Sequence, residues 1–161
     1  MVKGTAFSAP RPSWDDCWIT FYRNTDPIHT RMFIAPLREG VITAEPQWIS
    51  VNDGSTYDIL PEWSPDGGLM YFLSDRDGFR CLWAQRLEPV AKKPVGAAFA
   101  VQHFHSAHLS HRYVKPGQRP LSVARDKRWS RWPSTSAISG WRNWRAGEFS
   151  RGMPQNNNGS K

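Results

Sequence analysis

Short apolar runs alternate with turn-forming polar clusters along most of the chain. Residues 69–73 are continuously apolar and short enough for a buried strand, and residues 81–87 alternate as a half-buried strand would. The tight-turn sequence Ser64-Pro-Asp-Gly67 precedes the first run, and a second one, Ser74-Asp-Arg-Asp-Gly78, separates the two runs. Residues 1–126 have no helical spacing of apolar positions. The pattern therefore predicts an essentially all-β fold.

The same order of strands and turns occurs twice. Residues 10–23 align with residues 61–74 at an offset of 51, with Pro, Ser, Asp and Phe identical. A following strand, residues 31–37, aligns with residues 80–86 at an offset of 49, and residues 48–51 and 99–104 are the expected third strands. A period near 50 with several strands per unit is typical of the blades of a β-propeller.

This repeat suggests five segments. Residues 1–9 form an N-terminal leader, residues 10–57 the first repeat and residues 58–111 the second. Residues 112–127 begin a further strand region, and residues 128–161 form a basic tail that is irregular, disordered or frameshifted. Propellers close with four to eight blades, so two blades indicate a fragment of a larger propeller. The alternative is assembly of several copies into a ring.

The motifs of the second repeat resemble those of the TolB-type propeller repeat, a WD40-like (PD40) unit found in bacterial proteins. The resemblance rests on Trp63-Ser-Pro-Asp-Gly67, the apolar strand after it, the Ser74–Gly78 turn and Leu82-Trp83. The first repeat is a weaker copy, in which Trp14-Asp15-Asp16 replaces Pro-Asp-Gly. The resemblance implies a non-enzymatic scaffold for protein–protein contacts, often periplasmic in that family. It also leaves open an accessory propeller of a prolyl-oligopeptidase-like peptidase or of a sensor protein.

The net charge of +7 is concentrated in the tail. Residues 1–126 have a net charge of +1, and residues 127–161 a net charge of +6. Four Trp lie among Arg and Ser in residues 128–145. Such a tail could bind nucleic acid by phosphate attraction and base stacking, or an anionic membrane surface. The pattern favours a disordered or mistranslated tail, and nucleic-acid binding is the less favoured interpretation.

A frameshift is one hypothesis for this composition. Shifting the reading frame by two bases over residues 137–145 permits a peptide containing Asn-Ile-Trp, which resembles the strand at Cys81-Leu-Trp83. A frameshift near Lys127 would then have replaced the last strands. Sequencing the coding DNA tests this hypothesis, which fails if no alternative frame encodes those strands.

Four histidines, His103, His105, His108 and His111, form the only metal-like cluster in the sequence. Imidazole suits zinc, copper or nickel, but no cysteine or carboxylate is near them in the chain. The pattern favours a polar strand face and loop, and no metal site is predicted.

Turn chemistry also explains the acidic residues. Asp75-x-Asp77-Gly78 lacks the later ligands of a calcium loop, and Asp15, Asp16 and Asp66 occupy turns. The chain has no nucleophile elbow, phosphate-binding loop or His-Glu-x-x-His motif. We therefore expect no enzyme activity, no catalytic residue and no cofactor.

The remaining features bear on redox state and location. Cys17 and Cys81 are expected to be free thiols rather than a disulfide. No apolar run is long enough to span a membrane, and the N-terminus lacks the apolar region of a secretory signal, so the compartment is not determined. The partner is expected to be another protein, the missing blades of a parent propeller or further copies of the chain. Exposed blade edges predict marginal stability or self-association.

Overall fold

The computed structural model describes residues 7–103, 121–123, 127–131 and 141–145. These residues form three antiparallel sheets and one short 3-10 turn, η1 (Glu45–Gln47), and they contain no α-helix. The predicted all-β class is thus confirmed. Within this part of the chain, no helix is long and apolar enough to cross a membrane.

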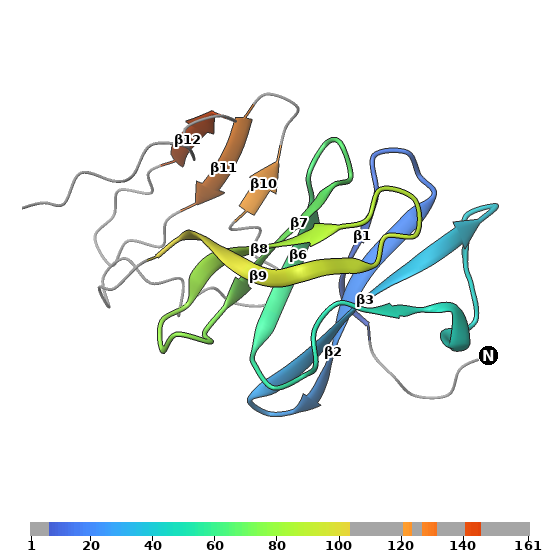
Figure 1. Cartoon of the computed structure of the whole chain (residues 1–161), viewed down its shortest axis with the longest axis horizontal. Coiled ribbons are helices and arrows are strands. Elements are labelled where there is room, and N and C mark those ends of the chain that lie inside the picture. Colours follow the sequence, from blue (N-terminus) through green and yellow to red (C-terminus); the bar gives the residue numbers. More distant parts are fainter. Residues whose placement is uncertain (1–6, 104–120, 124–126, 132–140, 146–161) are drawn as a thin grey trace, which may run out of the picture.

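Each of the first two sheets is an antiparallel meander (Figure 1). The first, blue to teal in Figure 1, contains β1 (Ser8–Pro12), β2 (Trp18–Asp26), β3 (His29–Arg38), β4 (Val41–Ile42) and β5 (Ile49–Ser50), with β4 and β5 both paired to β3. The second, green to yellow, has the order β6 (Asp58–Trp63), β7 (Leu69–Ser74), β8 (Cys81–Leu87) and β9 (Pro94–Gln102). The third contains β10 (Leu121–Val123), β11 (Lys127–Arg131) and β12 (Trp141–Arg145).

The same turn joins the first two strands of both large sheets. In the β6–β7 turn, the Ser64 hydroxyl donates to Asp66 Oδ1 (2.5 Å) and accepts from the Leu69 N–H (2.8 Å). In the β1–β2 turn, the Ser13 hydroxyl donates to Asp15 (2.5 Å) and accepts from the Trp18 N–H (3.0 Å). Each carboxylate also accepts a backbone N–H two residues later. Short polar side chains therefore close both turns by bonding to nearby backbone.

A β-bulge also recurs at the offset of 51. The register shifts between Ser8 and Arg11 where β1 pairs with β2, and between Ile59 and Glu62 where β6 pairs with β7. In each bulge one residue is left-handed, Ala9 at φ 49° and Leu60 at φ 56°. A bulge inserts an extra residue and increases the local twist. The two sheets therefore share an irregular backbone feature as well as a strand order.

The two large sheets stack face to face around one core. The Thr20 hydroxyl of β2 contacts Met70 Sδ of β7 (3.6 Å), and Met32 of β3 lines a groove together with Phe72 and Gln85. Side chains alternate along a strand, so the second sheet turns its other apolar positions to its opposite face. These residues are also buried: Tyr71, Leu73, Leu82 and Ala84.

The stacking is head to tail rather than symmetric. The first sheet uses Thr20, Tyr22, Met32 and Ile34 against the second. By ladder register the equivalent residues are the outward-facing Tyr71, Leu73, Leu82 and Ala84. The register gives an offset of 50 for the second strands, which corrects the offset of 49 expected from the sequence. Because the two sheets present different faces to each other, the same contact could be repeated by a further sheet. The third sheet follows the second in the chain and also contacts it. Strand β10 contacts β6, and Val123 packs against the core.

Polar contacts reinforce the junction. Asp58, at the start of β6, is fully buried, and its Oδ2 accepts from Asn52 Nδ2 (2.8 Å) and Arg76 Nη2 (2.9 Å). The Thr30 hydroxyl of β3 accepts from the Asp58 N–H (2.7 Å). Near β1, Arg11 pairs with Glu62 (2.7 Å). These bonds link the two sheets at both ends of β6.

Several element bounds differ from the sequence-based expectations. β1 begins at Ser8, inside the predicted leader, and β9 begins at Pro94 rather than at residue 99. The tail was expected to be irregular, but residues 127–131 and 141–145 are paired strands, β11 and β12. Their many Trp and Arg residues suit a strand because Trp favours extended backbone, and pairing can override a weak alternation.

Candidate functional site

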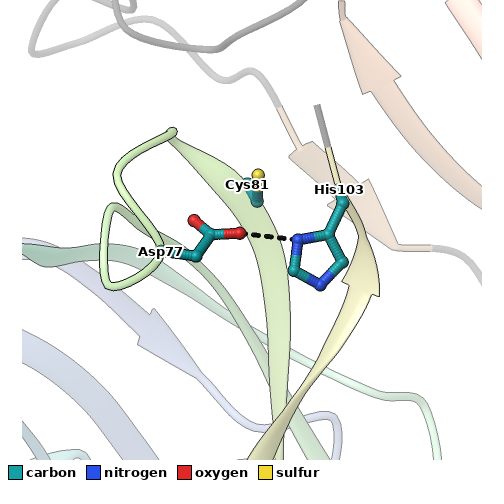
Figure 2. Close-up of side chains that lie close together, drawn as sticks. All are labelled: Asp77, Cys81 and His103. Atoms are coloured by element: carbon teal, nitrogen blue, oxygen red, sulfur yellow. Dashed lines mark hydrogen bonds and ion pairs between the residues drawn. The ribbon is translucent and has the colours of Figure 1, made fainter. Parts of the chain in front are cut away.

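Asp77, Cys81 and His103 meet at one end of the second sheet (Figure 2). Asp77 lies in the β7–β8 turn, Cys81 begins β8, and His103 directly follows β9. Of the residues that the structure describes, they are the group of three whose potential metal-ligand atoms all lie within 4.8 Å of one another.

The β7–β8 turn positions the carboxylate. Gly78 is left-handed at φ 84°, and its N–H donates to the Asp75 carbonyl (2.9 Å), which closes the turn. The Phe79 N–H donates to Asp77 Oδ1 (3.3 Å). This bond leaves Oδ2 turned toward β9, as the dashed line in Figure 2 shows.

Strand register brings the thiol and the imidazole to the same place. Cys81 pairs with Ser74 in the β7–β8 ladder, and Leu82 pairs with Gln102 in the β8–β9 ladder. His103 therefore lies beside Cys81, although 22 residues separate them in the chain. The His103 ring stands edge-on to Trp83 at 5.4 Å between centroids, which holds the ring against the sheet.

The side chains of His103 and Asp77 are hydrogen-bonded to each other. His103 Nδ1 lies 2.6 Å from Asp77 Oδ2, and the two side chains are 37% and 20% exposed. Burial alone would raise the pKa of Asp77. The hydrogen bonds from the Phe79 N–H and the His103 ring together outweigh the effect of burial, and they hold the pKa of Asp77 below its ordinary value. The carboxylate is therefore charged at neutral pH.

The thiol is enclosed. Cys81 has no exposed surface, whereas Cys17 is exposed, and neither forms a disulfide. A cysteine hydrolase needs a nucleophile that reaches a substrate carbonyl. Cys81 cannot reach one in this structure. The arrangement instead offers sulfur, nitrogen and oxygen donors that converge from three elements.

The sequence-based candidates have different outcomes. His103 belongs to this group, whereas His105, His108 and His111 lie outside the described residues. No cysteine or carboxylate is near the histidines along the chain, but the fold brings Cys81 and Asp77 beside His103. The residues near His103 in the chain could not have predicted this group, because Asp77 precedes His103 by 26 residues and only the β8–β9 pairing brings the two together.

Asp15 and Asp66 bond within their own turns, as local turn chemistry predicts, whereas Asp75 bonds to a residue 18 positions away. Asp75 Oδ1 accepts from the Tyr57 N–H (3.3 Å), and Asp15 and Asp66 accept from serine hydroxyls. Asp16 takes a left-handed conformation at φ 55°. None of these carboxylates joins a group of three ligands among the described residues.

A groove of about 320 Å³ lies between the two large sheets. Its polar lining is already bonded within the protein: Asn52 and Arg76 donate to Asp58, and Gln85 donates to the carbonyls of Val95 and Gly96. These residues stabilise the junction and leave the Asp77–Cys81–His103 group as the candidate for chemistry.

Comparison with known proteins gives no assignment, because no family model matches the chain and no curated protein is significantly similar to it.

Proposed function

We propose that residues 8–103 are two consecutive blades of a β-propeller, and that the chain is a non-enzymatic scaffold for protein–protein contacts. The proposal rests on the offset of 51, at which the Ser-x-Asp turn and the left-handed bulge both recur. It agrees with the resemblance of Trp63-Ser-Pro-Asp-Gly67 and the following turn to the TolB-type repeat.

The head-to-tail stacking supports this reading. Blades of a propeller each pack one face on the preceding blade and the other on the following blade. Here the face of the first sheet that contacts the second is equivalent to the outward face of the second sheet. A closed pair of sheets, as in a sandwich, would instead bury matching inner faces against each other.

The outer face of the first sheet is where a preceding blade would pack. It has an aromatic cluster of Phe7, Phe21, Phe33 and Trp48, with the Arg23 guanidinium 4.6 Å from the Trp48 ring centre. Phe7 is 38% exposed. Two blades cannot close a ring of four to eight, so further blades from a parent protein or further copies of the chain are the expected partners.

Association of the full chain tests the proposal. Sedimentation velocity should show an oligomer with enough blades for a ring, or an open series of larger species. Phe7→Asp should weaken association because it places a charge on the outer aromatic face. Ile28→Asp is the matched control, because Ile28 is 69% exposed and lies in the β2–β3 turn rather than in a strand of that face. A monomer that melts cooperatively would contradict the proposal, as would equal effects of the two substitutions.

A further inference from the structure

We propose that Asp77, Cys81 and His103 bind a zinc-type divalent transition-metal ion at the end of the second sheet. The proposal is independent of the propeller, because it rests only on the convergence of three donor atoms within 4.8 Å. A tetrahedral ion would take the Cys81 sulfur, a His103 nitrogen and an Asp77 oxygen, with water as the fourth ligand.

The donor set selects the class of ion. Calcium and magnesium take oxygen ligands, whereas thiolate and imidazole favour zinc and its neighbours in the first transition row. A site with one sulfur, one nitrogen and one oxygen from the protein leaves one tetrahedral position open. Figure 2 shows the three side chains where β8 begins and β9 ends. His103 is partly exposed there, so water can reach the site.

The observed geometry is close to that of a bound state. Ligand atoms around tetrahedral zinc are about 3.3–3.6 Å apart, given bonds of about 2.0 Å to nitrogen and oxygen and 2.3 Å to sulfur. His103 Nδ1 and Asp77 Oδ2 lie 2.6 Å apart and must separate slightly, and the Cys81 sulfur lies within 4.8 Å of the other ligand atoms. Shifts of about an ångström satisfy both, and the side chains need no change of strand register.

Metal binding at this site is coupled to loss of a proton. A thiolate ligand requires loss of the Cys81 thiol proton. An ion bound at His103 Nδ1 takes the place of the proton between Nδ1 and Asp77 Oδ2, and that proton moves to Nε2 of the neutral imidazole. Binding to the neutral imidazole therefore releases one proton, that of the Cys81 thiol, and no oxidant or reductant takes part. The same ion would fix the β7–β8 turn, through Asp77, and the end of β9, through His103, to Cys81 of β8.

Cobalt(II) is the probe for the test, because thiolate-to-cobalt charge transfer absorbs in the near ultraviolet and imidazole ligands do not produce that band. The untagged full chain is used in a Cys17→Ser background, which leaves Cys81 as the only thiol. We expect the band to saturate at one equivalent of cobalt and to disappear when zinc is added.

Substitutions decide whether the site is the one proposed. His103→Gln and Asp77→Asn should each weaken cobalt binding at least about tenfold. His29→Gln is the matched control, because His29 Nδ1 also lies 2.6 Å from an aspartate, Asp26 Oδ2, in the equivalent turn of the first sheet. It should leave the titration unchanged.

The test has clear adverse outcomes. Absence of a thiolate band in the Cys17→Ser chain overturns the proposal, and so does a band whose titration is unchanged by His103→Gln. Loss of folding does not obscure the result, because His103 is 37% exposed and circular dichroism of the metal-free variant verifies its structure.

Discussion

A single buried carboxylate joins residues from both large sheets. Asp58 has no exposed surface, and it bonds to Asn52, which follows β5, and to Arg76 in the β7–β8 turn. Hydrogen bonds to a charged group are stronger than neutral ones, and removal of one partner leaves the others unsatisfied. Asp58 is therefore a residue at which a small change should cost considerable stability.

Asp58→Ala should lower the free energy of unfolding by about 3 kcal/mol, because it leaves the Arg76 and Asn52 donors facing a cavity. Arg76 is 23% exposed and can regain some water, which places the loss at the low end for a broken buried pair. Urea unfolding measures the change. Glu39→Ala, an exposed position, is the control and should stay within about 0.5 kcal/mol. Equal effects of the two substitutions would show that the Asp58 carboxylate does not stabilise the junction between the two sheets.

At the scale of elements, the two Ser-x-Asp turns have the same hydrogen bonds but differ at one backbone position. Gly67 is left-handed at φ 66°, and its equivalent in the first turn, Asp16, is left-handed at φ 55°. Glycine adopts this conformation at no steric cost, whereas other residues pay about 1 kcal/mol or more. The first turn is therefore the more strained copy.

Reciprocal substitutions test this difference. Asp16→Gly should stabilise the chain by about 0.5 kcal/mol, since relief of strain exceeds the added entropy of the unfolded chain. Gly67→Ala should destabilise the chain by about 1 kcal/mol, because the backbone at residue 67 is left-handed and the new Cβ would lie 2.9 Å from Lys92 Nζ. Thermal melts of the two variants should shift in opposite directions. Shifts of the same sign would contradict the conclusion that Asp16 is the strained residue and Gly67 the relaxed one.

Local chemistry determined which elements could be foreseen. The Ser64–Gly67 turn and strand β7 follow from adjacent residues, and they lie where the sequence placed them. Strand β6 was not predicted as a strand, because Pro61 interrupts it and Leu60 forms a bulge. The Asp77–Cys81–His103 group could not be foreseen, since it depends on the β8–β9 register across 26 residues.

At the scale of the molecule, the two large sheets share one core rather than forming separate units. The buried apolar cluster includes Met32 and Ile34 of the first sheet together with Met70 and Phe72 of the second. Each sheet alone would expose one of these faces. Nearest-neighbour packing of this kind predicts that the two sheets unfold together.

Met32→Ala tests whether the shared core couples them. Met32 is fully buried between the sheets, and its truncation should cost about 2–4 kcal/mol. Because the lost contacts belong to both sheets, amide hydrogen exchange should quicken by similar factors in β3 and in β7. Val41→Ala, at a position that is 68% exposed, should change neither. If exchange quickened in β3 while β7 kept its protection, the second sheet would be stable without the first, and the cooperative two-sheet core would have to be abandoned.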